Sequence, residues 1–173
     1  MLQRVGAVFT SKYANRAWRR NEEALRIHTD ILPDVLVAQT RLPRPFINQV
    51  IRQMKAAGRI SAGRPYAPPI TPKDISRLVL ALSAPSPSRS VEHERSAGML
   101  VSADGRTVDG AIIDLLSAGE LSGQIAVSQS RPFVEIRTEA GTQTFGNLAD
   151  GFATFVIVPI AAAVAIGRAL INR

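Results

Sequence analysis

Apolar side chains recur every three to four residues along the first two-thirds of the chain, with polar positions between them. This spacing puts the apolar positions on one face of a helix. Prolines in a first turn, capping side chains and glycines after a last turn set the ends of each segment. Helices are predicted over 21–31, 33–39, 45–57, 73–84, 91–101 and 108–118. Gly58 ends the third of these, and Thr107 and Gly119 bound the last.

The spacing changes to a period of two in the last third of the chain. Ile125 and Val127 alternate with polar neighbours, and Gly141 marks a turn. Alternation places every second side chain on the same face of a strand. Residues 124–145 are therefore predicted to form an antiparallel hairpin or a small sheet.

The apolar stretch 151–167 carries no charged side chain and supports two interpretations. One is a tail anchor, because the stretch approaches the ~20 residues that span a bilayer as a helix. The other is a buried strand over 153–160, followed by a closing helix over 160–172. Pro159 lies in the middle of the stretch and favours the second, so a membrane partner is not expected. Three apolar residues of the closing helix would pack against the sheet: Ile160, Val164 and Leu170.

Glycine and proline divide the chain into three parts. Residues 59–72 contain four prolines and one glycine, which exclude a long helix and predict a wing-like loop followed by a linker. Residues 84–90 form a second break. We expect an N-terminal domain over 1–66, a linker with one helix over 67–90, and an α+β domain over 91–173 that mediates self-association. The predicted fold class is α+β.

The net charge of +7 is concentrated at one end. Residues 1–66 carry 12 Lys and Arg side chains against 4 Asp and Glu, whereas residues 67–173 carry 9 against 10. Such a separation indicates that the N-terminal part meets a polyanion. Residues 1–20 are either a basic arm that follows a phosphate backbone or an ordered element with Trp18 packed on the core.

Residues 31–60 contain two helices joined by a short turn, the arrangement of a helix-turn-helix, whose second helix enters the major groove of DNA. Five apolar residues share one face of the helix predicted over 45–57: Ile47, Val50, Ile51, Met54 and Ala57. The opposite face carries Asn48, Gln49, Arg52 and Gln53. Asn and Gln can bridge the edge of adenine, and Arg can bridge the edge of guanine. These four residues are the candidates for base contacts.

Basic residues flank this polar face, and we expect five of them to bind phosphates: Arg41, Arg44, Lys55, Arg59 and Arg64. No Asp or Glu occurs between Val35 and Lys73. A polar helix face that touches only water is the alternative, but solvated faces usually mix both signs of charge. The absence of carboxylates therefore favours a DNA-binding face.

The stretch VAQTRLPRPFINQVIRQMKAAGRI, residues 37–60, resembles winged helix-turn-helix domains of bacterial and phage regulators. Eight residues match the pattern of that family: Ala38, Thr40, Leu42, Ile47, Val50, Met54, Gly58 and Ile60. The resemblance implies a recognition helix from Arg44 to Lys55 and a wing tip at 61–64. Arg41 stands where the pattern has glycine, and no clear second wing strand follows Arg64.

These observations predict a sequence-specific double-stranded DNA-binding protein, a transcriptional regulator of bacterial or phage origin that acts as a homo-oligomer, expected to be a dimer. The layout also resembles the small terminase subunit of phages, which packages DNA as a ring. A third hypothesis is an adaptor that binds no DNA or is anchored in a membrane. The mass of the assembly separates the first two hypotheses.

Motifs of common enzyme classes are missing from the sequence. It has no phosphate-binding loop, no G-x-S-x-G motif and no spaced set of metal ligands, and its histidines, His28 and His93, stand apart. We therefore expect no catalytic residues, no metal and no cofactor. The lack of cysteine fits a reducing compartment, and a cytoplasmic location is expected.

Overall fold

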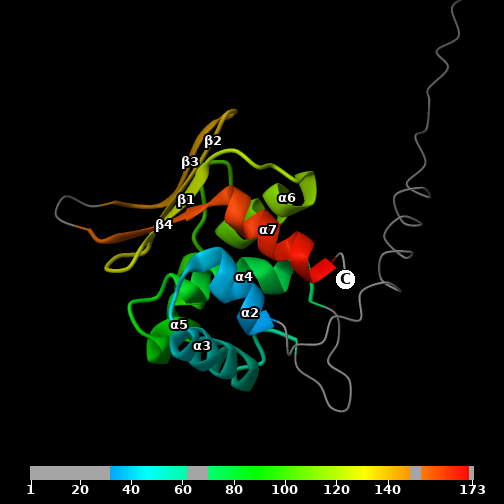
Figure 1. Ribbon diagram of the computed structural model, residues 1–173. Helices are drawn as coiled ribbons and strands as arrows, with labels where there is room; N and C mark the ends of the chain where they lie inside the picture. The colour runs from blue at the N-terminus through cyan, green and yellow to red at the C-terminus, as the bar shows by residue number, and fades with distance from the viewer. Residues whose placement is uncertain (1–31, 62–69, 149–152, 172–173) are drawn as a thin grey trace, which may run out of the picture.

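The computed structural model describes residues 32–61, 70–148 and 153–171 (Figure 1). Its helices are α2 (Leu32–Thr40), α3 (Arg44–Ala56), α4 (Pro72–Leu82), the 3-10 helix η1 (Pro87–Arg89), α5 (Ser90–Gly98), α6 (Val108–Ala118) and α7 (Ile160–Ile171). Its strands are β1 (Gln124–Ser128), β2 (Phe133–Thr138), β3 (Gly141–Gly146) and β4 (Phe155–Pro159). The α+β class is confirmed. The predicted helix over 21–31 and the segment 1–20 lie outside the described residues.

Local signals set the ends of two helices close to where the sequence predicts them. At the end of α3, Gly58 adopts a φ of +63° and the Arg59 amide donates to the Met54 carbonyl at 2.9 Å. This is the Schellman arrangement, which satisfies the last carbonyls of a helix. At the start of α6, the Thr107 hydroxyl accepts a hydrogen bond from the Gly110 amide. Both helices thus begin and end within one residue of the prediction.

Helix α4 lies at the centre of the molecule, although the sequence placed it in a linker over 67–90. Its side chains Ile75, Leu78 and Leu80 are at most 1% exposed, and it packs against α3, α5, α6 and α7. Its first turn is fixed by a capping box in which Thr71 and Asp74 bind each other's backbone amides. One hydrophobic cluster extends from α2 to α7. The predicted helix is present, and four neighbouring helices bury it.

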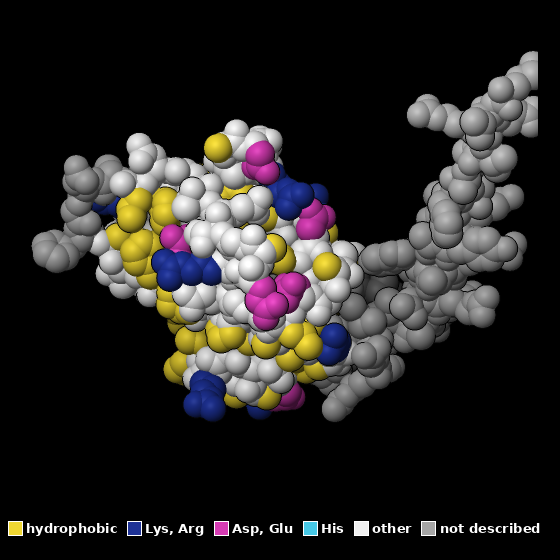
Figure 2. All heavy atoms as spheres, turned by 90° about the horizontal axis from the view of Figure 1, so that it is seen from above, with side chains coloured by type: hydrophobic (Ala, Val, Ile, Leu, Met, Phe, Trp, Pro, Cys, Tyr) yellow, Lys and Arg dark blue, Asp and Glu magenta, His cyan; other side chains and the backbone are white. Residues whose placement is uncertain are grey.

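The four strands form an antiparallel sheet in the order β3-β2-β1-β4. In its register Ile125 lies opposite Ile136 on one side and Val158 on the other, so apolar side chains share the inner face. On the outer face Phe133 and Phe155 meet edge to face, with ring centroids 6.1 Å apart. Figure 2 shows hydrophobic side chains gathered on the side of the molecule where the sheet lies.

Strand β4 is an edge strand and not the buried strand that the sequence predicted. It pairs only with β1, and Ile157 on its outer face is 49% exposed. The apolar run predicts a strand correctly but cannot tell a central strand from an edge strand. Burial depends on which elements pack against the outer face, and no described element covers Ile157 fully.

The C-terminal segment changes from strand to helix between Pro159 and Ile160, so residues 155–171 do not form one continuous helix. In the described part of the chain, no helix is long and apolar enough to cross a membrane. Ile160, Val164 and Leu170 are buried as expected. Helix α7 packs mainly against α2 and α4, however, and makes fewer contacts with the sheet, at β4. Figure 1 shows α7 passing beside α2.

Candidate nucleic-acid interface

Helix α3 presents two sharply different faces. Ile47, Val50 and Met54 are 0% exposed, because they pack into the core that α3 shares with α2, α4 and α5. The four predicted base-contacting residues lie on the opposite face and are all exposed: Asn48, Gln49, Arg52 and Gln53. Lys55 is half-buried at the edge of this face. The polar face is thus open along the length of the helix and carries no carboxylate.

The turn between α2 and α3 depends on Arg41. Its φ of +58° lies in the left-handed region that normally favours glycine. The Arg41 amide donates to the Val37 carbonyl at 3.0 Å, and the Thr40 hydroxyl donates to the Leu36 carbonyl at 2.7 Å. These bonds close the end of α2. Arg41 therefore departs from the helix-turn-helix pattern in residue type, but its backbone adopts the conformation that glycine favours there.

Arg44 lies at the start of α3 and is paired with Asp34 at the start of α2, at 2.7 Å. Both side chains are more than half exposed, so the ion pair is accessible to water and to ligands. Such pairs contribute little to stability. Arg44 lies at the surface, but its charge is partly neutralised by Asp34. This carboxylate precedes the stretch between Val35 and Lys73 that contains no Asp or Glu.

The guanidinium of Arg59 is engaged within the protein, and the expectation that it binds phosphate stays a prediction. Its guanidinium makes two hydrogen bonds with Glu94 of α5, at 2.7 and 2.8 Å, and Glu94 is 1% exposed. The hydrogen bonds to Glu94 raise the pKa of Arg59 above its ordinary value. Arg77 donates to the Arg59 carbonyl at 2.7 Å. Arg59 is thus committed to neutralising a buried carboxylate, which no local sequence pattern reveals.

Arg64 and the predicted wing tip lie outside the described residues. The residues on either side, 60–61 and 70–71, do not belong to a strand. Asp74 joins these two sides, because one of its carboxylate oxygens binds the Ser61 hydroxyl and also the Thr71 amide, at 3.1 and 2.9 Å. The two ends of the segment 62–69 are therefore held next to each other beside α3.

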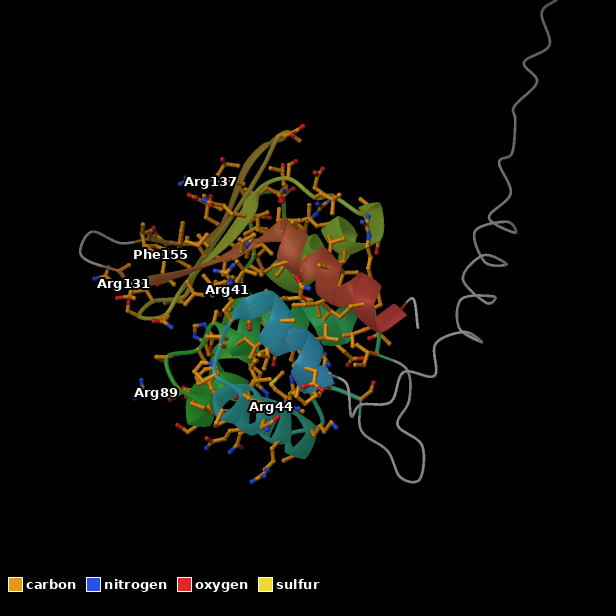
Figure 3. The ribbon with its side chains drawn as sticks, in the orientation of Figure 1. Arg41, Arg44, Arg89, Arg131, Arg137 and Phe155 are labelled. Atoms are coloured by element: carbon orange, nitrogen blue, oxygen red, sulfur yellow. The ribbon has the colours of Figure 1, made fainter. Side chains whose placement is uncertain are left out.

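Arg89 is a basic residue beside α3 that sequence reasoning did not single out. It is exposed at the end of η1, and η1 packs directly against α3. Figure 3 shows Arg89 and Arg131 projecting from the same side of the molecule. A residue some forty positions from α3 offers no periodicity or motif that could place it there. Only the packing of η1 brings it to the edge of the candidate interface.

A hollow of about 510 Å³ separates η1 and α5 from the turn between β1 and β2. Arg89, His93 and Arg131 line it together with Glu92. Burial lowers the pKa of His93, which favours its neutral imidazole. Nε2 of His93 lies 3.1 Å from the Ser83 hydroxyl, but that hydroxyl is buried and donates to the Leu80 carbonyl. A serine in this setting is not presented as a nucleophile.

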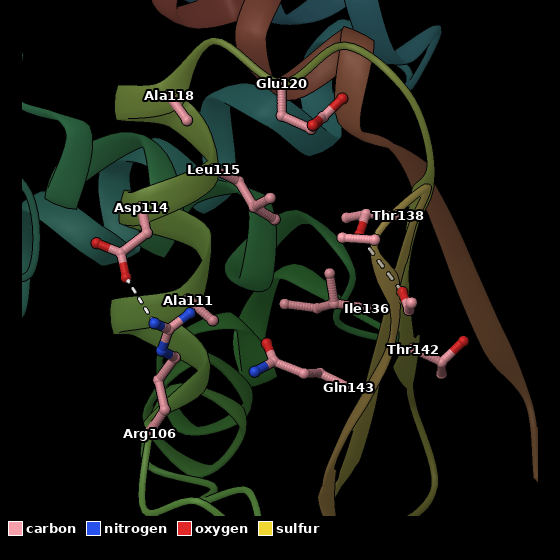
Figure 4. Close-up of a pocket in the computed structure, with 12 residues that line it drawn as sticks. Arg106, Ala111, Asp114, Leu115, Ala118, Glu120, Ile136, Thr138, Thr142 and Gln143 are labelled. Atoms are coloured by element: carbon pink, nitrogen blue, oxygen red, sulfur yellow. Dashed lines mark hydrogen bonds and ion pairs between the residues drawn. The ribbon is translucent and has the colours of Figure 1, made fainter.

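A second hollow, of about 390 Å³, lies between α6 and the β2–β3 hairpin (Figure 4). Arg106 and Asp114 form an ion pair of 3.6 Å at one wall, and Glu120 lies at the other end. Arg106 and Asp114 are exposed, Glu120 is partly buried, and the three groups are not arranged around a common point. Neither hollow brings together three His, Asp or Glu side chains that could hold a metal ion, as far as the described residues go.

Comparison of the chain with protein-family models, with curated proteins and with solved structures gave no match.

Proposed function

We propose that this protein binds double-stranded DNA in a sequence-specific manner and acts as a transcriptional regulator, with α2 and α3 as its helix-turn-helix. One observation carries the proposal: the face of α3 opposite the buried Ile47, Val50 and Met54 is open and offers only amide and guanidinium groups. Such groups match the donors and acceptors on base edges in the major groove. A helix with this face turned outward suits insertion into that groove.

Phosphate contacts follow from the charges around this face. Arg41 and Arg44 lie at the start of α3, Lys55 lies near its end, and Arg89 lies on the neighbouring η1. Cations on both flanks of a recognition helix fix its register on the duplex. We include Arg89 in the set and leave out Arg59, whose guanidinium is bound to Glu94.

The winged form of the motif is part of the proposal. Residues 62–69 include Arg64, and the contacts of Asp74 with Ser61 and Thr71 hold the ends of this segment together beside α3. A basic residue in this segment is a candidate for a phosphate contact beside α3. Self-association remains a further expectation, since two copies double the contacted site.

The test begins with selection of preferred sequences from a random double-stranded DNA pool, followed by mobility shifts on the selected site at two salt concentrations. Arg52→Ala is expected to weaken binding to the selected site by about 1–3 kcal/mol and to relax its sequence preference. Arg137→Ala, which removes the same charge from the outer face of the sheet, is the matched control and should leave both unchanged.

Two results would contradict the proposal. One is a selection that enriches no sequence, with binding that disappears at moderate salt for every fragment, because this behaviour indicates only non-specific attraction. The other is equal loss of affinity in Arg52→Ala and Arg137→Ala, since the face of α3 would then have no special part in binding.

A further inference from the structure

A third cavity, of about 260 Å³, lies where the helix-turn-helix meets the C-terminal half of the chain. Thr40, Leu42 and Phe46 line it from the turn and the start of α3. Val156 of β4 and Ala162 of α7 line it from the opposite side. Because α2 packs against α7, this cavity lies at a contact between two parts of the fold that the sequence separates by more than one hundred residues.

The lining selects an uncharged occupant. None of the residues that line the cavity is Asp, Glu, Lys, Arg or His, and most of them are aliphatic. Three polar side chains of the lining bond within the protein: the Thr40 hydroxyl donates to the Leu36 carbonyl, the Ser83 hydroxyl to the Leu80 carbonyl, and the Gln129 amide to the Ser83 carbonyl at 2.9 Å. Gln39, the fourth, is exposed. A charged molecule would lose its hydration here without gaining a partner of opposite charge. An apolar molecule loses no such interaction.

The volume sets the size of the occupant. An engineered apolar cavity of about 150 Å³ in another protein binds benzene, so a cavity of 260 Å³ has room for roughly ten non-hydrogen atoms. This space is too small for a helix or a peptide strand with its side chains. It suits a small aromatic or branched aliphatic molecule.

The cavity also touches the strained part of the helix-turn-helix. Arg41, with its φ of +58°, lies between Thr40 and Leu42, and both of these neighbours line the cavity. Backbone strain of this kind persists where the surrounding packing enforces it, and it is concentrated at switch regions and ligand sites. A molecule that fills the cavity therefore acts on the turn that sets α3 against α2.

We propose that this cavity binds a small, uncharged and mainly apolar molecule, and that its occupancy changes the affinity of α3 for DNA. The first half of the proposal stands on the cavity alone, whereas the second half rests on the proposed DNA-binding function. Reciprocity requires that DNA change the affinity for the small molecule by the same factor.

Indole, an uncharged bicyclic molecule of about the right size, is the probe. It is titrated into the full-length protein while the methyl resonances are followed by NMR. Saturable shifts are expected at Leu42, Val156 and Ala162, which line the cavity, and not at Ile112 of the distant α6 core. The absence of saturable shifts up to the solubility limit of indole, or shifts centred elsewhere, would overturn the proposal.

Two neighbouring alanines of α7 provide matched variants. Ala162 is half-buried in the lining, whereas Ala161 is exposed, so Ala162→Leu fills the cavity and Ala161→Leu adds the same group to the surface. Ala162→Leu is expected to weaken indole binding at least about tenfold, and Ala161→Leu to change it less than about twofold. If Ala162→Leu fails to fold, Val156→Leu fills the same space from β4. If Ala162→Leu and Ala161→Leu bind indole equally well, indole does not bind in this cavity.

The link to DNA is measured separately. Saturating indole is expected to change the Kd for the selected DNA site at least about threefold, and Ala162→Leu should change it in the same direction. If indole binds but leaves the Kd unchanged, the linkage is wrong and the site remains. If the protein selects no DNA at all, the proposed function fails while the indole titration still tests the cavity.

Discussion

Arg41 is a residue whose side chain and backbone have opposing preferences. Its left-handed backbone costs a residue other than glycine about 1–2 kcal/mol. The side chain is exposed, so burial of the side chain does not offset this cost. A cation at the turn of a helix-turn-helix, next to the DNA backbone, is the benefit that the proposed function supplies.

This gives a prediction at the scale of one residue. Arg41→Gly should leave the free energy of unfolding unchanged or raise it by up to about 1 kcal/mol, because glycine relieves the strain but is more flexible when unfolded. The same variant should weaken binding to every DNA sequence. It should also lower the number of counterions released on binding by about one, as read from the salt dependence of the affinity. Urea unfolding and mobility shifts measure the two effects. DNA binding that is unaltered in the glycine variant would show that Arg41 has no contact with phosphate.

Helices α2 and α3 form a unit whose exposed charges can be altered without disturbing its core. Leu36, Ile47 and Val50 hold the two helices together at 0% exposure, while the Asp34–Arg44 pair lies at the surface. The pair is expected to contribute less than about 1 kcal/mol to stability. Its main effect is electrostatic, because Asp34 places a negative charge at the edge of the proposed DNA-binding face.

Asp34→Asn tests this at the scale of the element. The variant should bind the selected DNA more tightly, because it removes a charge that repels phosphate and releases Arg44. Its affinity for other DNA sequences should rise as well, so its sequence preference should fall. Asp114→Asn on α6 is the matched control, as Asp114 is equally exposed and also paired with an arginine, Arg106. A weaker complex with Asp34→Asn would mean that Arg44 needs its carboxylate partner to be positioned for binding.

The whole molecule is joined by contacts between segments that lie far apart in the sequence. Arg59 follows α3, and Glu94 lies 35 residues further along, buried in α5. Together with the packing of α4 against four helices, this ion pair connects α2 and α3 to the rest of the core. The N-terminal unit is therefore one face of a continuous hydrophobic core.

Arg59→Ala is the corresponding prediction. Removing Arg59 takes two hydrogen bonds from the buried Glu94 and leaves Arg77, at 3.8 Å, as its cationic neighbour, so the variant should lose up to about 3 kcal/mol of unfolding free energy. Arg52→Ala, which removes an exposed arginine from the same region, should stay within about 0.5 kcal/mol of the original protein. Denaturant unfolding measures both variants. Equal stabilities would contradict the structural part assigned to Arg59 and restore it as a candidate for phosphate binding.

The elements of this fold were predictable where short-range rules act. Proline in a first turn, the Thr107 cap and glycine at the last turn bracketed α3 and α6 within one residue. The spacing of Ile47, Val50 and Met54 correctly identified the buried face of α3, and hence the exposed face of the candidate interface. These features depend on hydrogen bonds and side-chain contacts between residues four or five positions apart. The residue types at such short spacings can be read from the sequence.

The sequence by itself thus determined the α+β class, the positions of most helices and strands, and which side of α3 is polar. Tertiary structure alone decided that Arg59 binds Glu94, that α4 is central, that β4 is an edge strand, and that Arg89 lies beside α3. The physical reason is the distance along the sequence between the residues that interact. A cap or a helix face depends on adjacent turns, whereas a buried ion pair or a cavity between α2 and α7 depends on which distant segments pack together.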